Sequence, residues 1–343
     1  MISGKQHAER ERFLFRDLHT KVFMGTASDR YAGWIGQIYS EDRYTDRITR
    51  RTKTVGGKRF IEEILPVESV EEYFRHFSIL EVDFTFYRSL LDKDEKPTQT
   101  FHVLRNYRQH LNKEDRLVLK VPQIIFAKKL RRGAVYIENE QYLNPEVFIH
   151  QFYEPSLGLL GARIDGFIFE QEYQRKQDRS SAEEQAAELK KFFSLIPQDN
   201  RYHVELRTET FLSSPVFKVL EEYGVGQVLS HWTWLPSLSR QFALSGNRVL
   251  NSGRHCIVRL MTPRGMRYED AYGRAHPFNK LIEGMLSPQM INETTGIMRA
   301  AIEDGAQINV IINNRSGGNA PLIAQKIAKQ FLTESEVVSS ENI

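Results

Sequence analysis

Charged and aromatic side chains follow one apolar run near residue 80 at a spacing that could do chemistry. The stretch ILEVDFTFYR (79–88) begins with β-forming residues, carries Glu81 and Asp83 two positions apart, and ends in Tyr87 and Arg88. Residues two positions apart in a strand point to the same face, so both carboxylates would face one side. Because a buried carboxylate needs a cation or a hydrogen-bond donor, the stretch predicts either a ligand site or a structural ion network.

Polar or aromatic side chains also stand at the ends of other apolar runs. In chain order these are Thr26 and Trp34, Lys120, Glu170 and Gln171, Glu205 and Arg207, His231 and Trp232, Arg259, and Asn313, Asn314 and Arg315. We expect Glu81 and Asp83 to point inward and meet Lys120, Arg207 and Arg259. An ion network that only satisfies its own charges would explain this pattern. Clustering at one end of the fold favours a ligand site.

Eight short runs rich in β-branched and aromatic residues are predicted as strands, with helical patterns between them. The strands are expected at 21–25, 77–83, 117–121, 165–171, 202–207, 226–232, 256–261 and 308–314. Helices are expected over 182–196, 214–224 and 321–332, and the last two have proline in the first turn. This alternation predicts an α/β fold of the TIM-type (β/α)8 class, with its site at the C-terminal ends of the strands.

Length and composition fit one soluble domain. The 343 residues are 41% hydrophobic and 27% charged, with a formal net charge of +3. We expect an N-terminal extension at 1–20, a barrel domain at 21–332 with insertions after strands 1, 3 and 7, and a disordered tail at 333–343. No apolar run suits a membrane span or a signal peptide, so we expect a cytoplasmic protein without a membrane partner. The single cysteine, Cys256, excludes an internal disulfide and lies in an apolar run typical of a buried thiol.

Six stretches, in order over roughly residues 20–332, resemble the motifs of one protein family. They are GTASDRYAGW (25–34), YFRHFSILEVDFTFYR (73–88), LVLKVP (117–122), VELR (204–207), CIVRLMTPRGMRYEDAY (256–272) and INVIINNRSGGNAP (308–321). The chain resembles the YecE-like proteins, the domain-of-unknown-function family numbered 72. The resemblance implies a TIM-type barrel with a candidate site at its mouth, and it implies no particular reaction.

The sequence departs from the family pattern at four places. Residues 27–29 replace the family's Ser-Gly-Trp, and Asp83 replaces an asparagine. The sequence IIFAKK (124–129) stands where Thr-His usually follows the third strand, and FEQEYQ (169–174) stands where Gln-x-Pro-Pro is common. Roles that the family assigns to these positions do not transfer to this chain.

Two motifs could bind an anion. Gly317 and Gly318 precede a predicted helix, where free backbone N–H groups and the helix dipole favour a phosphate. The TPRGMR stretch brings Arg264, Gly265 and Arg267 to the neighbouring loop. Loops after strands 7 and 8 are a common phosphate site in this fold. Alternatively, the glycine pair only forms a tight turn, with Asn319 capping the helix.

The carboxylates could also take part in acid–base chemistry. Glu81 or Glu205 could act as the general base of a hydrolase, with Lys120, Arg207 and Arg259 stabilising negative charge and Asn313 positioning the ligand. A glycosidase would use the two glutamates as a pair and stack its sugar on Trp34, Trp232 or Trp234. Carboxylates that only pair with cations explain the same residues.

A metal site and a nucleic-acid surface are two further hypotheses. Glu81, Asp83, Glu205 and His231 could ligate a divalent metal, but the neighbouring cations compete for the carboxylates, and we assign no cofactor. Residues 43–59 hold seven basic residues and one acidic residue, and 128–132 adds four basic residues. Such loops beside aromatic residues would suit a nucleic-acid backbone, although a solvated basic loop is the alternative.

The sequence therefore predicts a polar, cationic pocket at the barrel mouth that binds an anionic, phosphorylated or nucleotide-like ligand and could serve a hydrolase. A non-catalytic nucleic-acid-binding protein that uses the basic 43–59 loop is the alternative. The candidate catalytic residues are Glu81 and Glu205. The candidate ligand-binding residues are Thr26, Trp34, Asp83, Tyr87, Arg88, Lys120, Arg207, His231, Trp232, Arg259, Asn313, Asn314, Gly317 and Gly318.

Overall fold

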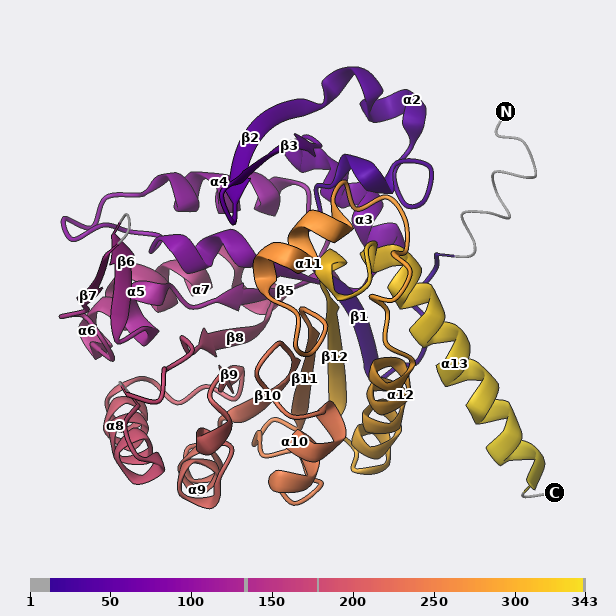
Figure 1. The fold of residues 1–343 in the computed structure, drawn as a ribbon. Coiled ribbons are helices and arrows are strands. Elements are labelled where there is room, and N and C mark those ends of the chain that lie inside the picture. The colour runs from indigo at the N-terminus through magenta and orange to yellow at the C-terminus, as the bar shows by residue number, and fades with distance from the viewer. Residues whose placement is uncertain (1–12, 133–134, 178, 342–343) are drawn as a thin grey trace.

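Eight parallel strands form a closed barrel. The computed structural model describes residues 13–132, 135–177 and 179–341. The barrel strands are β1 (Val22–Ala27), β4 (Ile79–Val82), β5 (Arg116–Lys120), β8 (Ile164–Glu170), β9 (Tyr202–Glu205), β10 (Gly226–His231), β11 (His255–Leu260) and β12 (Gln307–Ile312). Their order is β1-β12-β11-β10-β9-β8-β5-β4, and β1 pairs with β4 to close the ring. Each predicted strand overlaps one of these eight, so the predicted TIM-type barrel is confirmed (Figure 1).

Helices pack around the outside of the barrel. The longer ones are α3 (Val70–His76), α4 (Gln99–Gln109), α7 (Glu154–Leu160), α8 (Ala182–Leu195), α9 (Ser214–Glu222), α10 (Leu238–Leu244), α12 (Pro288–Glu303) and α13 (Ala320–Glu341). Helix α8 begins at a capping box in which Ser181 and Glu184 satisfy each other's backbone N–H groups. The three predicted helices correspond to α8, α9 and the first half of α13.

Longer segments follow β1, β5 and β11. The first contains α2 (Glu41–Tyr44) and the hairpin of β2 (Thr49–Val55) and β3 (Lys58–Ile64). The second contains α5 (Gln123–Phe126), the hairpin of β6 (Lys129–Arg132) and β7 (Val135–Glu138), and α6 (Pro145–Phe148). The third contains α11 (Tyr268–Ala275). The Tyr272 hydroxyl donates to Glu62 over 2.6 Å and joins α11 to the β2–β3 hairpin at the same end of the barrel (Figure 1).

The barrel interior changes from apolar to charged along the strands. Its middle layer contains Ile79, Val118, Ile168, Val228, Ile257 and Ile311, which pack together in one cluster. Because side chains two positions apart share a face, the next inward positions belong to Glu81, Lys120, Glu170, Ser230, Arg259 and Asn313. These residues form the upper layer at the C-terminal ends of the strands, which we call the mouth.

The structure describes part of the expected N-terminal extension and most of the expected C-terminal tail. Phe13 and Phe15 are buried, and the Phe15 N–H donates to the His76 carbonyl over 2.8 Å, so this part packs on the barrel domain. Residues 1–12 of the expected extension lie outside the described residues. Helix α13 continues to Glu341, beyond the position where we expected a disordered tail to begin. None of the helices in the described ranges is long and apolar enough to cross a membrane.

Candidate functional site at the barrel mouth

Arg259 lies at the centre of a buried ion network in the mouth. Its Nε and Nη2 atoms donate to the two carboxylate oxygens of Glu81, each over 2.6 Å. Its Nη1 atom lies 3.1 Å from Glu170 and also contacts Glu205. Such bidentate, charge-assisted bonds explain how a strand can bury a glutamate at this position.

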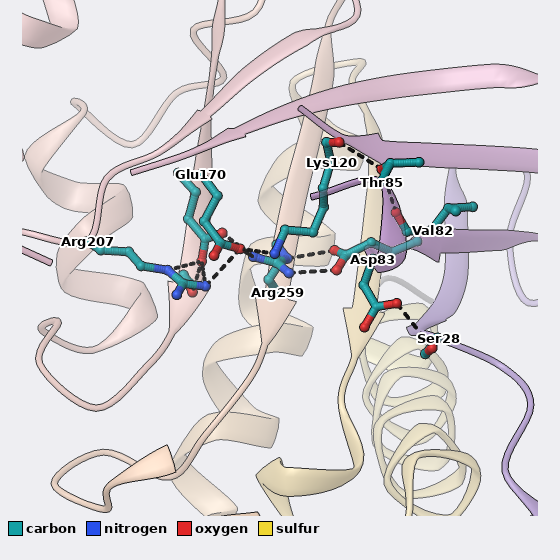
Figure 2. A network of polar contacts seen from close by, with 11 residues as sticks. Ser28, Val82, Asp83, Thr85, Lys120, Glu170, Arg207 and Arg259 are labelled. Atoms are coloured by element: carbon teal, nitrogen blue, oxygen red, sulfur yellow. Dashed lines mark hydrogen bonds and ion pairs between the residues drawn. The ribbon is translucent and has the colours of Figure 1, made fainter. Parts of the chain in front are cut away.

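Two further cations complete the network at Glu170. Lys120 Nζ and Arg207 Nη2 lie 2.5 Å and 3.0 Å from the same carboxylate oxygen of Glu170. Arg207 also lies 3.4 Å from Glu205, which accepts a 2.7 Å hydrogen bond from the Ser230 hydroxyl. Figure 2 shows Lys120, Arg207 and Arg259 converging on Glu170. Three cations therefore face three carboxylates, and the network has no net formal charge.

Burial and neighbouring charge act in opposite directions on these groups. Burial raises the pKa of Glu81, and the charges of Arg259 and Lys120 offset only part of that effect. Burial also acts to raise the pKa of Glu170, but Arg207, Lys120 and Arg259 outweigh it and hold the pKa well below its usual range. The three carboxylates hold the pKa of Arg259 well above its ordinary value despite its burial. Glu170 and Arg259 are therefore charged at neutral pH.

The network is closed at its centre and open at one edge. The Arg259 side chain has no exposed surface, whereas Lys120 is 9% and Arg207 16% exposed. Of the three cations, Arg207 and, to a smaller extent, Lys120 are therefore accessible from the mouth.

Two exposed aromatic residues and one half-buried aromatic residue flank this open edge. Trp232 and Trp234 follow β10, and Tyr173 follows β8. The Tyr173 ring centre lies 6.2 Å from that of Trp232 and 6.0 Å from that of Trp234. The Arg207 guanidinium lies 4.8 Å from the Trp232 ring centre, which is a cation–π distance. Tyr173 is 42% and Trp234 48% exposed, so we call these three residues the aromatic platform.

Asp83 does not join the network, contrary to the sequence prediction. Strand β4 ends at Val82, and the Thr85 hydroxyl donates to the carbonyl oxygens of Val82 and Lys120 over 2.9 Å and 2.7 Å. This turn breaks the two-residue period, and Asp83 instead accepts a 3.3 Å hydrogen bond from the Ser28 hydroxyl (Figure 2). Asp83 thus faces away from the three cations that we expected it to meet.

A groove of about 870 Å³ begins at Asp83 and extends beneath the β2–β3 hairpin. Its aromatic walls include Tyr31, Phe84, Tyr87 and Tyr107. A cavity of this volume is large enough for a nucleotide-sized ligand. We call it the Asp83 groove.

Comparison with known proteins agrees with this architecture. A family model described as Protein of unknown function DUF72 matches residues 23–342. The chain belongs to the DUF72 family. The resemblance seen in its motifs is therefore confirmed.

Two solved DUF72 structures have the same fold. A DUF72 protein from Enterococcus faecalis V583 is 16% identical with a TM-score of 0.55, and the match covers 90% of this chain and 95% of that chain. A DUF72 protein from Thermotoga maritima MSB8 is 13% identical with a TM-score of 0.54, and the match covers 91% and 99% of the two chains. A comparison with curated proteins finds no match.

Trp34 of this DUF72 protein belongs to the core, which corrects its assignment as a ligand-binding residue. It has no exposed surface, its Nε1 donates to Asn314 over 3.1 Å, and its ring lies between those of Tyr31 and Tyr39. Because a buried indole cannot stack on a ligand, a ligand at the mouth could stack only on other aromatic residues.

The glycine pair after β12 also has a packing role. Gly317 and Gly318 are buried, and both N–H groups donate to the Asn314 carbonyl, over 3.3 Å and 2.6 Å. A Cβ atom at Gly318 would collide with the carbonyl oxygen of Lys280. The first N–H of α13 donates to the Asn314 side chain. These donors are occupied, so we do not include the glycine pair in the anion site.

Thr26, Asn313 and Asn314 make hydrogen bonds that hold the loops after β1 and β12. The Thr26 hydroxyl donates to the Ser28 carbonyl over 2.7 Å and is fully buried. The Asn313 side chain accepts the Arg315 N–H over 3.0 Å and begins the short helix η8 (Asn314–Ser316). All three are therefore buried supports of the loops that follow β1 and β12.

His231 is buried, and Arg88 is exposed. Burial, with the charge of Arg264, lowers the pKa of His231 to about 4, so the ring is neutral at pH 7. Its Nδ1 atom is buried without a hydrogen-bond partner among the described residues. Over those same residues, no three His, Cys, Asp or Glu side chains gather where they could hold a metal ion. The carboxylates of the predicted metal set point to Arg259 or to Ser28 instead.

Ion pairs neutralise most of the basic 43–59 segment. Arg50 pairs with Glu63 over 2.8 Å, and Arg51 and Lys53 both pair with Glu62, over 2.8 Å and 3.0 Å. Arg43 and Arg47 pair with glutamates of the segment 68–72. In the second basic segment, Lys128 pairs with Glu188 over 2.8 Å. These cations are not available as a continuous unpaired patch.

Sequence reasoning missed three residues that the structure brings to the site. Glu170, which binds three cations, stands at a predicted strand end but is not among the predicted site residues. Tyr173 lies three positions after Glu170 in FEQEYQ, and a single tyrosine in a loop does not indicate a binding site. Its neighbours in space, Trp232 and Trp234, are distant in the sequence. Ser230 could have been found, because it lies two positions before Trp232 and therefore faces inward on β10.

Proposed function

We propose that this DUF72 protein binds a nucleotide-like ligand, with an anionic group and a planar ring, at the open edge of the ion network. The strongest support is the position of Arg207, which is bound to Glu170, partly exposed, and placed over Trp232. An anionic group would interact with Arg207 and Lys120. A planar ring would stack on Trp234 and Tyr173, because aromatic side chains bind bases through their faces.

Binding has more support than hydrolysis by Glu81 or Glu205. A general base must come within hydrogen-bond distance of the proton that it removes. Both glutamates are fully buried, and each is bound to Arg259. A reaction that used either glutamate would first require Arg259 to release it.

The basic 43–59 segment gives less support to the alternative, nucleic-acid binding through that segment. Its cations are mostly paired, as Arg207 and Lys120 also are, but the one aromatic residue of the segment, Tyr44, is buried and offers no stacking surface. We therefore place the ligand at the mouth and treat binding through the hairpin as an outcome of the test.

Calorimetric titration of the purified protein with a mononucleotide, a sugar phosphate, inorganic phosphate and a neutral sugar tests the proposal. Two variants address the site, Arg207→Met and Trp234→Ala. Arg248→Ala and Leu195→Ala are matched controls, since both residues are exposed and lie at the opposite end of the barrel. Stacking and phosphate contacts are each worth about 1–3 kcal/mol, so each site variant should weaken mononucleotide binding roughly tenfold.

Equal affinity in wild type and both site variants would refute the site. Binding of the neutral sugar but not the mononucleotide would refute the anionic ligand. Oligonucleotide binding that is lost only after Arg50 and Arg51 are changed to alanine would establish the hairpin alternative instead. Trp234→Ala keeps the test decisive if Arg207→Met is unstable, because Trp234 is exposed and makes no contact with the network.

A further inference from the structure

A second cation lies on an aromatic ring across the mouth from Arg207. The Arg315 guanidinium lies 4.4 Å from the ring centre of Tyr268, the first residue of α11. Among the residues that the structure describes, the Nε atom of Arg315 is buried without a hydrogen-bond partner. A buried N–H group without an acceptor is unfavourable, so a ligand that supplied one would be stabilised there.

Arg315 lies near two tyrosines of the Asp83 groove, although it is not itself among the residues that line the groove. It is close enough to the hydroxyl groups of Tyr31 and Tyr87 to act on both electrostatically, and both tyrosines line the groove. Tyr87 is 70% exposed, so its ring is open to a ligand. Asp83 lines the same groove and can accept hydrogen bonds from the N–H groups of a base or the hydroxyls of a sugar.

Tyr173 of the aromatic platform and Arg315 lie on opposite sides of the barrel, whereas Trp232 and Trp234 follow β10, two positions from β12. Arg315 follows β12, whereas Tyr173 follows β8, and these two strands are four positions apart in the closed ring of eight. Arg207 follows β9, which lies opposite β1. A ligand that contacts both sides must therefore extend across the mouth.

We infer that the mouth has two nucleotide subsites and that its ligand is a chain of at least two nucleotides, either a dinucleotide or a single strand of nucleic acid. This inference rests on the proposed function. Each subsite places one guanidinium against aromatic rings, which matches the alternation of phosphate and base along a strand. Proteins bind single strands with the same combination of cations and stacking rings. A mononucleotide would occupy only one of the two subsites.

Calorimetric titrations with thymidine monophosphate and the dinucleotide pTpT, and anisotropy with a fluorescein-labelled dT10, test the inference. The variants are Arg315→Ala and Arg315→Lys, with Arg248→Ala as the control. Wild type should bind pTpT about tenfold more tightly than the monophosphate. Arg315→Ala should remove this advantage and change mononucleotide affinity by less than about twofold. Arg315→Lys should restore part of it, because lysine keeps the charge but lacks the planar stack.

The salt dependence gives an independent readout. A phosphate contact contributes about one unit to the slope of log affinity against log salt, so Arg315→Ala should lower the dT10 slope by about one. Equal affinity of wild type for pTpT and the monophosphate, or an unchanged advantage in Arg315→Ala, would overturn the two-subsite inference alone. Failure of all three nucleotide probes to bind would overturn the proposed function itself. Tighter binding of dT10 than of pTpT identifies a strand, and equal binding identifies a dinucleotide.

Discussion

Replacement of Arg259 by methionine should destabilise the protein and make its stability pH-dependent. In the wild type, three cations face three carboxylates in the mouth, and Arg259, Glu81 and Glu205 have no exposed surface. Methionine roughly keeps the volume but leaves two cations for three carboxylates. Removing one partner of a buried ion pair costs about 3–5 kcal/mol, so we expect a loss of this size in the free energy of unfolding at pH 8.

Part of this loss should be recovered at pH 5. Glu81 loses its bidentate partner, and burial already raises its pKa in the wild type. In the Arg259→Met variant, the pKa of Glu81 in the folded state would lie further above its pKa in the unfolded state. Between these two pKa values, the folded protein therefore binds more protons than the unfolded protein. Stability then falls as pH rises between the two pKa values, with a slope of up to about 1.4 kcal/mol per pH unit.

Urea unfolding followed by far-UV circular dichroism at pH 5 and pH 8 measures both effects. The double variant Arg259→Met with Glu81→Gln restores charge balance, so it should be more stable than the single variant at pH 8 and lose the pH dependence. Arg248→Met is the matched control, because Arg248 forms an exposed pair and should matter by less than about 0.5 kcal/mol. An Arg259→Met protein as stable as wild type at both pH values would refute the reasoning.

Three further predictions concern other parts of the site and the core. Glu170→Gln should lower stability at pH 7 and lower it less near pH 3, since the stability due to Glu170 is fully present above its unfolded pKa and is lost progressively as pH falls from that value towards its lowered folded pKa; urea unfolding at both pH values checks this, and an equal loss at both would contradict it. Gly318→Ala should lower the free energy of unfolding by about 2 kcal/mol or more in the same assay, because φ at Gly318 is +111° and the new Cβ would collide with the Lys280 carbonyl oxygen. Gly57→Ala, at an open turn, should cost about 1 kcal/mol. Mononucleotide affinity should be unchanged in both variants. Burial raises the pKa of the Cys256 thiol to about 12, so a thiol reagent at pH 8 should label only the unfolded protein, and rapid labelling of the folded protein would show that the thiol is accessible.

The strand pattern predicted the barrel and four of the six residues of the ion network, Glu81, Lys120, Arg207 and Arg259. Ile79 and Ile257 are both apolar residues of the barrel interior, and Glu81 and Arg259 lie two positions further along their strands. The two-residue period therefore places them in one layer of a closed barrel. The same period failed at Asp83, because β4 ends one residue earlier and the Thr85 hydroxyl holds the following turn.

Burial of individual aromatic residues and glycines could not be predicted from local sequence. Trp34 donates to Asn314, which is 280 positions away in the chain, and only the closed barrel brings the two together. Gly318 needs its open position because the segment at Lys280 crosses it. Both features depend on contacts between segments that are distant in the sequence, and residue type alone does not reveal such contacts.

The ion pairs of the basic 43–59 segment can be predicted from the sequence. Gly56 and Gly57 are a two-residue hairpin signal, and the hairpin register opposes Arg50 to Glu63 and Arg51 to Glu62. If residues 49–64 form one hairpin, these arginines and glutamates lie opposite each other on its two strands. Residues 43–59 taken alone are strongly basic because Glu62 and Glu63, on the second strand of the hairpin, lie outside that range.

Intrinsic fluorescence tests nucleotide binding at the aromatic platform most directly. The chain has three tryptophans, of which Trp34 is fully buried and Trp234 is 48% exposed beside the half-buried Trp232. Titration with a mononucleotide, corrected for nucleotide absorbance, should cause a saturable quench in wild type. The quench should be much smaller in Trp234→Phe and weaker in Arg207→Met. Unchanged tryptophan fluorescence at saturating mononucleotide in wild type would contradict binding at this site.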